Sequence, residues 1–168
     1  MFVVHATKKL LDRIGPSTLQ QGEESTAALG AWYATVLFWR PQVVLWVNEQ
    51  TLLPVLMPLA PAATLATRFP AQLATVLTAH GIPDSVIEAE LARMADVRIA
   101  KTANRSVVGI MTEFTHLAEV YRAHDPASDP LGLAVRLAAT PCGPLYSRHV
   151  SPDRELRARL QPTAPPPS

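Results

Sequence analysis

The 168-residue sequence predicts an α+β fold: a small, mainly antiparallel sheet of three to four strands, with about six helices packed mainly on one face. Two observations favour this class. Apolar residues recur at three- and four-residue intervals in some segments, as in amphipathic helices, whereas other segments are short apolar runs rich in β-branched residues. The resulting order of elements, β-α-α-β-β-α-α-β-α-α, is that of an α+β fold.

Strands and helices are expected in the following order along the chain. The pattern predicts strands at 2–5, 42–47, 52–59 and 96–101. It predicts helices at 8–14, 27–39, 68–80, 83–94, 106–122 and 130–139. Polar residues 48–51 would join the second and third strands into a hairpin. Pro54 and Pro58 cannot donate backbone hydrogen bonds, so the third strand is expected either at a sheet edge or with its proline nitrogens facing outward.

The expected helix at 27–39 depends on an aromatic-rich stripe. Trp32, Tyr33, Val36 and Trp39 recur at helical spacing, and Pro41 would end the helix because proline cannot continue its hydrogen-bond ladder. The sequence contains five aromatic residues near this stripe and the following strand: Trp32, Tyr33, Phe38, Trp39 and Trp46. Core packing is one interpretation of this set, and an interface is the other.

Domain organisation follows from length and composition. Residues 1–150 are expected to form a single α+β domain. Residues 151–168 contain several arginines and then a proline-rich stretch, so a disordered C-terminal tail is expected there.

Charge and composition limit the function classes. Fifteen basic and 14 acidic residues give a net charge of +1, which excludes a protein that coats nucleic acid through a strongly basic surface. The apolar runs are too short to span a membrane. The lone Cys142 cannot form an internal disulfide, and no secretory leader is recognisable, so a cytoplasmic location is expected. Arginine outnumbers lysine, and alanine and proline are frequent, which is typical of a bacterial protein from a GC-rich genome.

A candidate anion site lies where the last expected strand meets the next helix. Free backbone N–H groups and the helix dipole at such a junction favour a phosphate or carboxylate. The junction also offers two cations and three short hydrogen-bonding side chains: Lys101, Thr102, Asn104, Arg105 and Ser106. The alternative is that Thr102 or Asn104 only caps the helix while the two cations are solvated.

Asn48 and Glu49 are the second pair of candidate ligand-binding residues. They occupy the tip of the expected hairpin, from which they would reach a ligand held at the same end of the sheet. Ordinary turn chemistry explains the asparagine equally well.

Motifs for catalysis, cofactors and metals are absent from the sequence. The five histidines lie in separate segments without metal-ligand spacing, and no phosphate-binding glycine loop occurs, so no cofactor and no metal are expected. Cys142 lies between Pro141 and Gly143 without a neighbouring base, so a nucleophilic role is not expected.

Three segments together resemble an uncharacterised bacterial domain family. They are 29–34, 45–58 and 100–114, with the sequences LGAWYA, LWVNEQTLLPVLMP and AKTANRSVVGIMTEF. The resemblance implies no known reaction. It implies a domain found standalone or beside a domain similar to the plasmid pRiA-type ORF-three proteins.

Three functions are compatible with these observations. The first is a non-enzymatic binding or interaction module that receives an anionic ligand or a protein partner. The second is an enzyme acting on a phosphate-containing or nucleic-acid substrate, with Glu49 as a base or metal ligand. The third is a structural homodimer formed through the hairpin edge or the aromatic segment. The binding module is favoured because the convergent acid–base or metal set that an enzyme needs is not evident.

Overall fold

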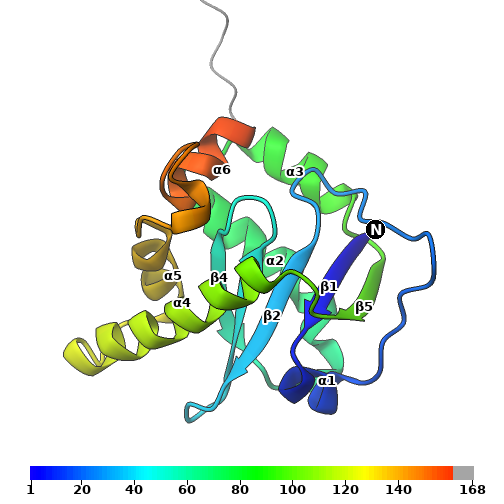
Figure 1. Cartoon of the computed structure of the whole chain (residues 1–168), viewed down its shortest axis with the longest axis horizontal. Coiled ribbons are helices and arrows are strands. Elements are labelled where there is room, and N and C mark those ends of the chain that lie inside the picture. Colours follow the sequence, from blue (N-terminus) through cyan, green and yellow to red (C-terminus); the bar gives the residue numbers. More distant parts are fainter. Residues whose placement is uncertain (161–168) are drawn as a thin grey trace, which may run out of the picture.

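One five-stranded mixed sheet, in the order β4-β3-β2-β1-β5, organises the chain (Figure 1). A computed structural model describes residues 1–160. The strands are β1 (Phe2–Ala6), β2 (Trp32–Leu37), β3 (Val43–Asn48), β4 (Pro54–Pro58) and β5 (Val97–Lys101). The helices are α1 (Lys8–Ile14), α2 (Leu65–Ala79), α3 (Asp84–Ala92), α4 (Arg105–His124), α5 (Pro130–Ala138) and α6 (Pro152–Leu160). Short 3₁₀ helices occupy Ala62–Thr64 and Gly143–Leu145.

The α+β class is confirmed, but the expected sheet is corrected in two respects. It has five strands rather than three to four, and it is mixed rather than mainly antiparallel. β1 pairs in parallel with both β2 and β5, whereas β2–β3 and β3–β4 are antiparallel. The helices between β1 and β2 and between β4 and β5 provide the long connections that parallel neighbours require. The β3–β4 hairpin and the edge position of β4 are confirmed.

The missing strand is β2, which lies within the segment expected to be the helix 27–39. Its side chains alternate, with Trp32 and Val36 in one hydrophobic core and Tyr33 and Leu37 in the other. A strand buried on both faces has apolar residues at every spacing, including three and four, and so it imitates a helical stripe. Gly30, with φ of 73°, also interrupts any helix before β2.

Helices cover both faces of the sheet, which corrects the expectation of helices mainly on one face. The first core lies under α1, α2, α3 and α6, and the ring of Phe69 stacks on Trp46 there with centroids 4.0 Å apart. The second core lies under α4 and part of α5, where Phe114 and Leu133 are buried. In Figure 1, α4 crosses in front of the strands, and α1 lies just beyond the end of β1.

The C-terminal segment differs from the expected tail. Residues 152–160 form α6, with acidic residues in its first turn and arginines in its last, an arrangement that complements the helix dipole. Leu156 is fully buried in the first core, and Glu155 accepts hydrogen bonds from Arg148 and His149. The charged residues of this segment led to the prediction of a solvated tail. Instead, the burial of Leu156 and the hydrogen bonds of the Glu155 carboxylate hold α6 against the rest of the protein. Residues 161–168, where the proline-rich tail was expected, lie outside the described residues.

Candidate functional site

The carboxyl ends of three parallel strands meet at one edge of the sheet. After β1 the chain enters α1, which packs on the first core through Leu10. After β5 it enters α4, which packs on the second core through Phe114. The chain therefore leaves two neighbouring parallel strands toward opposite faces. In open sheets containing parallel strands, ligands bind in the crevice outside such strand ends.

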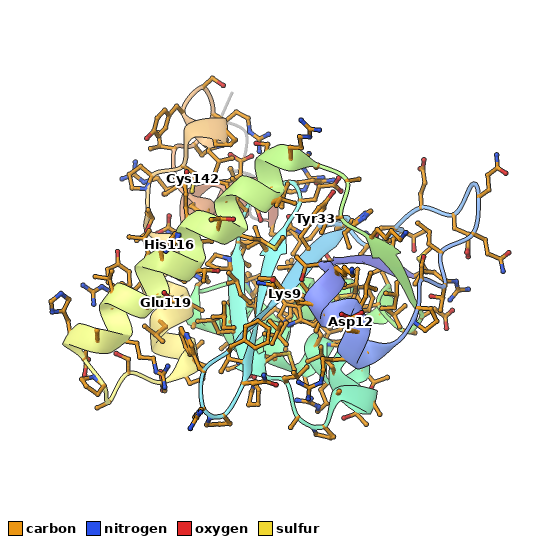
Figure 2. The ribbon with its side chains drawn as sticks, turned by 60° about the horizontal axis from the view of Figure 1, so that its bottom comes forward. Lys9, Asp12, Tyr33, His116, Glu119 and Cys142 are labelled. Carbon is orange, nitrogen blue, oxygen red and sulfur yellow. The ribbon has the colours of Figure 1, made fainter. Side chains whose placement is uncertain are left out.

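One groove at this edge lies between α1 and α4. It encloses about 400 Å³ and is lined from three elements. Thr7 and Lys9 line it from the start of α1, and residues 35–39 line it from the end of β2. The α4 side consists of Val108, Met111, Thr112, Thr115, His116 and Glu119. These positions share one side of the helix and extend over about 16 Å. Figure 2 shows Lys9 between α1 and the helix that presents His116 and Glu119.

Hydroxyl groups line the middle of this α1–α4 groove. Thr7 Oγ1 donates to Thr35 Oγ1 at 3.1 Å, which joins the end of β1 to β2. Thr112 and Thr115 donate their hydroxyl protons to the carbonyl oxygens of Val108 and Met111 in their own helix. Each of these donors keeps lone pairs that can accept a hydrogen bond. The middle of the groove is therefore polar, whereas Leu37 and Met111 make its floor apolar.

Three charged or titratable side chains in the groove form no ion pair within residues 1–160. Lys9 Nζ lies 5.4 Å from the centroid of the Phe38 ring. Within the described residues, the ion pairs are those of Arg98 with Glu23 and of Glu155 with Arg148 and His149, so Lys9 has no paired carboxylate. His116 and Glu119 are exposed on the opposite wall.

Two aromatic side chains form the end of the groove near the β2–β3 turn. Phe38 is 61% exposed, which is unusual for a large apolar residue. Trp39 is half-buried, with the guanidinium of Arg122 4.4 Å from its ring centroid. Trp32, Tyr33 and Trp46 are fully buried, so the core interpretation holds for these three aromatic residues. Sequence reasoning missed the groove because it placed Phe38 and Trp39 on a helix.

The strand-to-helix junction is arranged largely as a helix cap. Asn104 Oδ1 accepts from the backbone N–H groups of Ser106 at 2.9 Å and Val107 at 3.3 Å. The backbone N–H of Asn104 donates to the hydroxyl oxygen of Tyr33 at 2.8 Å. Several backbone donors assigned to an anion in the sequence analysis are thus partnered within the protein. An anion at the start of α4 stays a prediction, with fewer free donors than expected.

The side chains around Asn104 are divided between two places. Arg105 and Ser106 are exposed at the first turn of α4. Lys101 and Thr102 instead line a crevice between the ends of β1 and β5, together with Ala6, Lys8 and Leu11. The structure therefore brings Lys101 and Thr102 together with a lysine that the sequence analysis did not select.

Asn48 and Glu49 are separated from this edge. Asn48 is fully buried at the β3–β4 turn, where its Nδ2 donates to the carbonyl oxygen of Leu29 at 2.8 Å and its Oδ1 accepts from the backbone N–H of Thr51 at 2.9 Å. Glu49 is half-buried in the same turn. Neither residue lines the α1–α4 groove or the crevice that contains Lys101. The ordinary turn interpretation of Asn48 is the one its hydrogen bonds support.

Other chemical groups of the described residues give no catalytic arrangement. Burial raises the pKa of the Cys142 thiol to about 11, and the negative charge of Glu113 adds to this effect. At neutral pH this thiol is protonated and therefore a poor nucleophile. Residues 1–160 contain no cluster of three or more His, Cys, Asp or Glu side chains positioned to hold a metal ion. None of the helices in this range has the length and apolar character needed to cross a membrane.

Comparison with known proteins places the chain in a family. The chain belongs to the family described as Domain of unknown function (DUF6933), whose family model matches residues 3–155. This confirms the resemblance to an uncharacterised domain family. The association with pRiA-type neighbouring domains stays a prediction. No curated protein and no solved structure matches the chain.

Proposed function

We propose that this protein is a binding module for a small organic anion with an apolar body, held in the α1–α4 groove. The observation that supports it most directly is Lys9, which has no ion pair among the described residues and lines a groove of about 400 Å³ at the carboxyl edge of the parallel strands. An edge of this kind is a recurrent ligand-binding position in open sheets with parallel strands.

The size and lining of the groove fit such a ligand. Pockets for small molecules commonly enclose roughly 300–1,000 Å³ and combine apolar walls with a few polar groups that orient the ligand. Here Leu37, Met111 and the ring of Phe38 would contact the apolar body. The hydroxyl groups of Thr35 and Thr115 would orient its polar atoms.

Charge favours an anionic group at the α1 side of the groove. Lys9 stands over an aromatic ring rather than beside a carboxylate, so its ammonium protons are available to a ligand carboxylate or phosphate. Glu119 belongs to the opposite wall and also lines a shallower hollow beside Trp39 and Arg122. A ligand acid group would therefore approach Lys9 and keep away from Glu119.

The two alternative functions, an enzyme and a structural homodimer, require different features of the structure. An enzyme would require groups that move protons during a reaction, and His116 and Glu119 are the titratable candidates in the groove rather than Glu49. A homodimer would require a second copy to cover exposed apolar surface such as Phe38. Light scattering of the purified protein tests the homodimer without any ligand.

A pair of matched probes tests the binding module. Titration of the ¹⁵N-labelled protein with 1-naphthoate and, separately, with 1-naphthylmethylamine compares an anion and a cation of similar shape. We expect naphthoate to shift the amide signals of 35–39 and of the α4 residues in the groove. Lys9→Gln should weaken naphthoate binding about tenfold, equivalent to about 1.4 kcal/mol, because a charge-assisted contact is lost.

Lys8→Gln is the matched control, since Lys8 is the next residue in α1 but does not line the groove. It should leave naphthoate binding unchanged. Equal weakening in the two variants, stronger binding of the amine, or the absence of shifts in the groove would each contradict the proposal.

A further inference from the structure

A second crevice lies at the same edge of the sheet, between the ends of β1 and β5. It encloses about 490 Å³ and is lined by Ala6, Lys8, Leu11, Lys101 and Thr102. α1 leaves β1 toward the first core and α4 leaves β5 toward the second, so the two connections diverge beyond these strand ends, and α1 lines the crevice through Lys8 and Leu11. This divergence of two neighbouring connections is the geometry that forms a ligand crevice in sheets with parallel strands.

Two lysines from different elements line this β1–β5 crevice. Lys101 is the last residue of β5 and is paired in register with Ala6 of β1. Lys8 follows two residues after Ala6, at the start of α1. The pairing of adjacent parallel strands therefore places both lysines at the same opening, although 93 positions separate them in the sequence.

The backbone that presents Lys101 is fixed by His5. The Nδ1 atom of His5 lies 2.8 Å from the carbonyl oxygen of Lys101. Because a carbonyl oxygen only accepts, Nδ1 is the donor. The imidazole ring also stacks on Tyr33, with centroids 4.6 Å apart. The end of β5 is thus held in place, while the Lys101 side chain is exposed.

The charged groups of the crevice are not neutralised within the described residues. Neither Lys8 nor Lys101 forms an ion pair there, and the hydroxyl of Thr102 has no hydrogen-bond partner in the same range. Asp12, one turn beyond Lys8 in α1, is the nearest acidic residue in that helix, and it does not line the crevice. Two ammonium groups and a hydroxyl donor therefore face a common space without a carboxylate among its lining residues.

We propose that the β1–β5 crevice binds a phosphate group through Lys8, Lys101 and the Thr102 hydroxyl. A phosphate group has a charge of about −1.5 to −2 near neutral pH and three strong acceptor oxygens. Two lysines match this charge more closely than the single charge of a carboxylate, and lysine binds phosphate as a point charge. The site is independent of the α1–α4 groove, because no residue lines both.

The test is a titration of the ¹⁵N-labelled full chain with inorganic phosphate and with phenyl phosphate. We expect both probes to shift the amide signals of residues 6–8 and 101–102. Lys8→Gln and Lys101→Gln should each weaken phosphate binding at least tenfold. A preference for inorganic phosphate would identify the free ion as the ligand, and a preference for phenyl phosphate would identify a phosphate monoester.

Lys9→Gln and Arg105→Gln are the matched controls, since they remove cations next to the crevice in sequence but not in its lining. Both should bind inorganic phosphate, which has no apolar body for the α1–α4 groove, as the unmodified chain does. Equal weakening in all four variants would indicate a general charge effect and overturn the proposal. Weakening by Arg105→Gln alone would place the anion at the start of α4 and overturn it as well, as would the absence of shifts in the crevice. Lys9→Gln is the test variant for naphthoate and a control for inorganic phosphate, whereas Lys8→Gln is the reverse. Failure of the β1–β5 crevice is therefore distinguishable from failure of the α1–α4 groove.

Discussion

The two ends of β3 show how differently one strand can terminate. At its C-terminal end, Asn48 is fully buried and its side-chain amide joins three parts of the chain. Nδ2 donates to the carbonyl oxygen of Leu29, and Oδ1 accepts from the N–H and the hydroxyl of Thr51. Leu29 is held in turn by Glu90, whose carboxylate also accepts from the N–H of Ala28. The side-chain amide of Asn48 is thus satisfied within the protein, although Oε1 of Gln50 in the same turn is buried without a hydrogen-bond partner in the described residues.

The N-terminal end of β3 is arranged in the opposite way. Phe38 in the β2–β3 turn is exposed, and the ring of Trp39 contacts Arg122 through its face. Lys9 stands over Phe38 without a paired carboxylate in the described residues. Both the polar and the aromatic groups at this end therefore remain available to another molecule.

This difference separates residues that hold the fold from residues that can bind. A buried polar group that has all its partners stabilises one conformation, and its removal leaves those partners unsatisfied. Exposed cations and aromatic rings contribute little to folding, so their role is better sought in binding. By this reasoning, Asn48 stabilises the fold, and Lys9 is the better candidate for binding a ligand.

The largest expected effect is at Asn48. Asn48→Ala should lower the free energy of unfolding by about 3 kcal/mol, because it leaves the carbonyl of Leu29 and the N–H of Thr51 buried without this partner. Urea denaturation measures this loss. Glu49→Ala is the control in the same turn and should change stability by less than about 0.5 kcal/mol. Similar losses of stability in Asn48→Ala and Glu49→Ala would contradict the view that the buried amide of Asn48 stabilises this end of β3.

A smaller effect is expected at Asn104, which caps α4. Asn104→Ala should cost about 1 kcal/mol of stability, because two backbone N–H groups lose their acceptor. Asn104→Ser retains a capping oxygen and should recover most of the loss. The phosphate titration of Asn104→Ala should match that of the unmodified chain. A weakened phosphate affinity with unchanged stability would make Asn104 a ligand residue rather than a cap.

The smallest effect on stability is expected at Phe38. Phe38→Ala should change the free energy of unfolding by less than about 0.5 kcal/mol, since 61% of the residue is already exposed. The same variant should weaken naphthoate binding, because it removes the ring at the end of the groove. A loss above about 1 kcal/mol in denaturation would instead assign this turn to the fold, as at Asn48.

Local patterns predicted most of the regular elements. The expected helix at 8–14 has the bounds of α1, and the helix expected at 130–139 differs from α5 by one residue. Asp129 and Pro130 fix the start of α5, and Gly15, with φ of 108°, follows the end of α1; such local signals are readable from sequence alone. The edge position of β4 follows equally locally, because Pro54 and Pro58 lack backbone donors.

The candidate site was only partly predictable. Lys101 and Thr102 were expected at a strand end, and the structure places both in the lining of one crevice, while their binding of an anion stays a prediction. Lys8 was not selected, because its proximity to Lys101 depends on the pairing of β1 with β5. The α1–α4 groove was missed for a similar reason, since it exists only when Phe38 and Trp39 follow a strand.

The sequence by itself determined the α+β class, the hairpin and the absence of a recognisable catalytic motif, and it left Thr102 and Asn104 as alternative caps of α4. These depend on side-chain type and short-range spacing, which a single chain segment contains in full. Only the tertiary structure decided that 32–37 is a central strand, that helices cover both faces, and which cations share an opening. The physical reason is burial on both faces: β2 is apolar at every position except Thr35, so its own sequence does not distinguish period two from period 3.6. Pairing with β1 and β3 selects the extended conformation of β2, and the assembled sheet determines the positions of Lys8, Lys9 and Lys101.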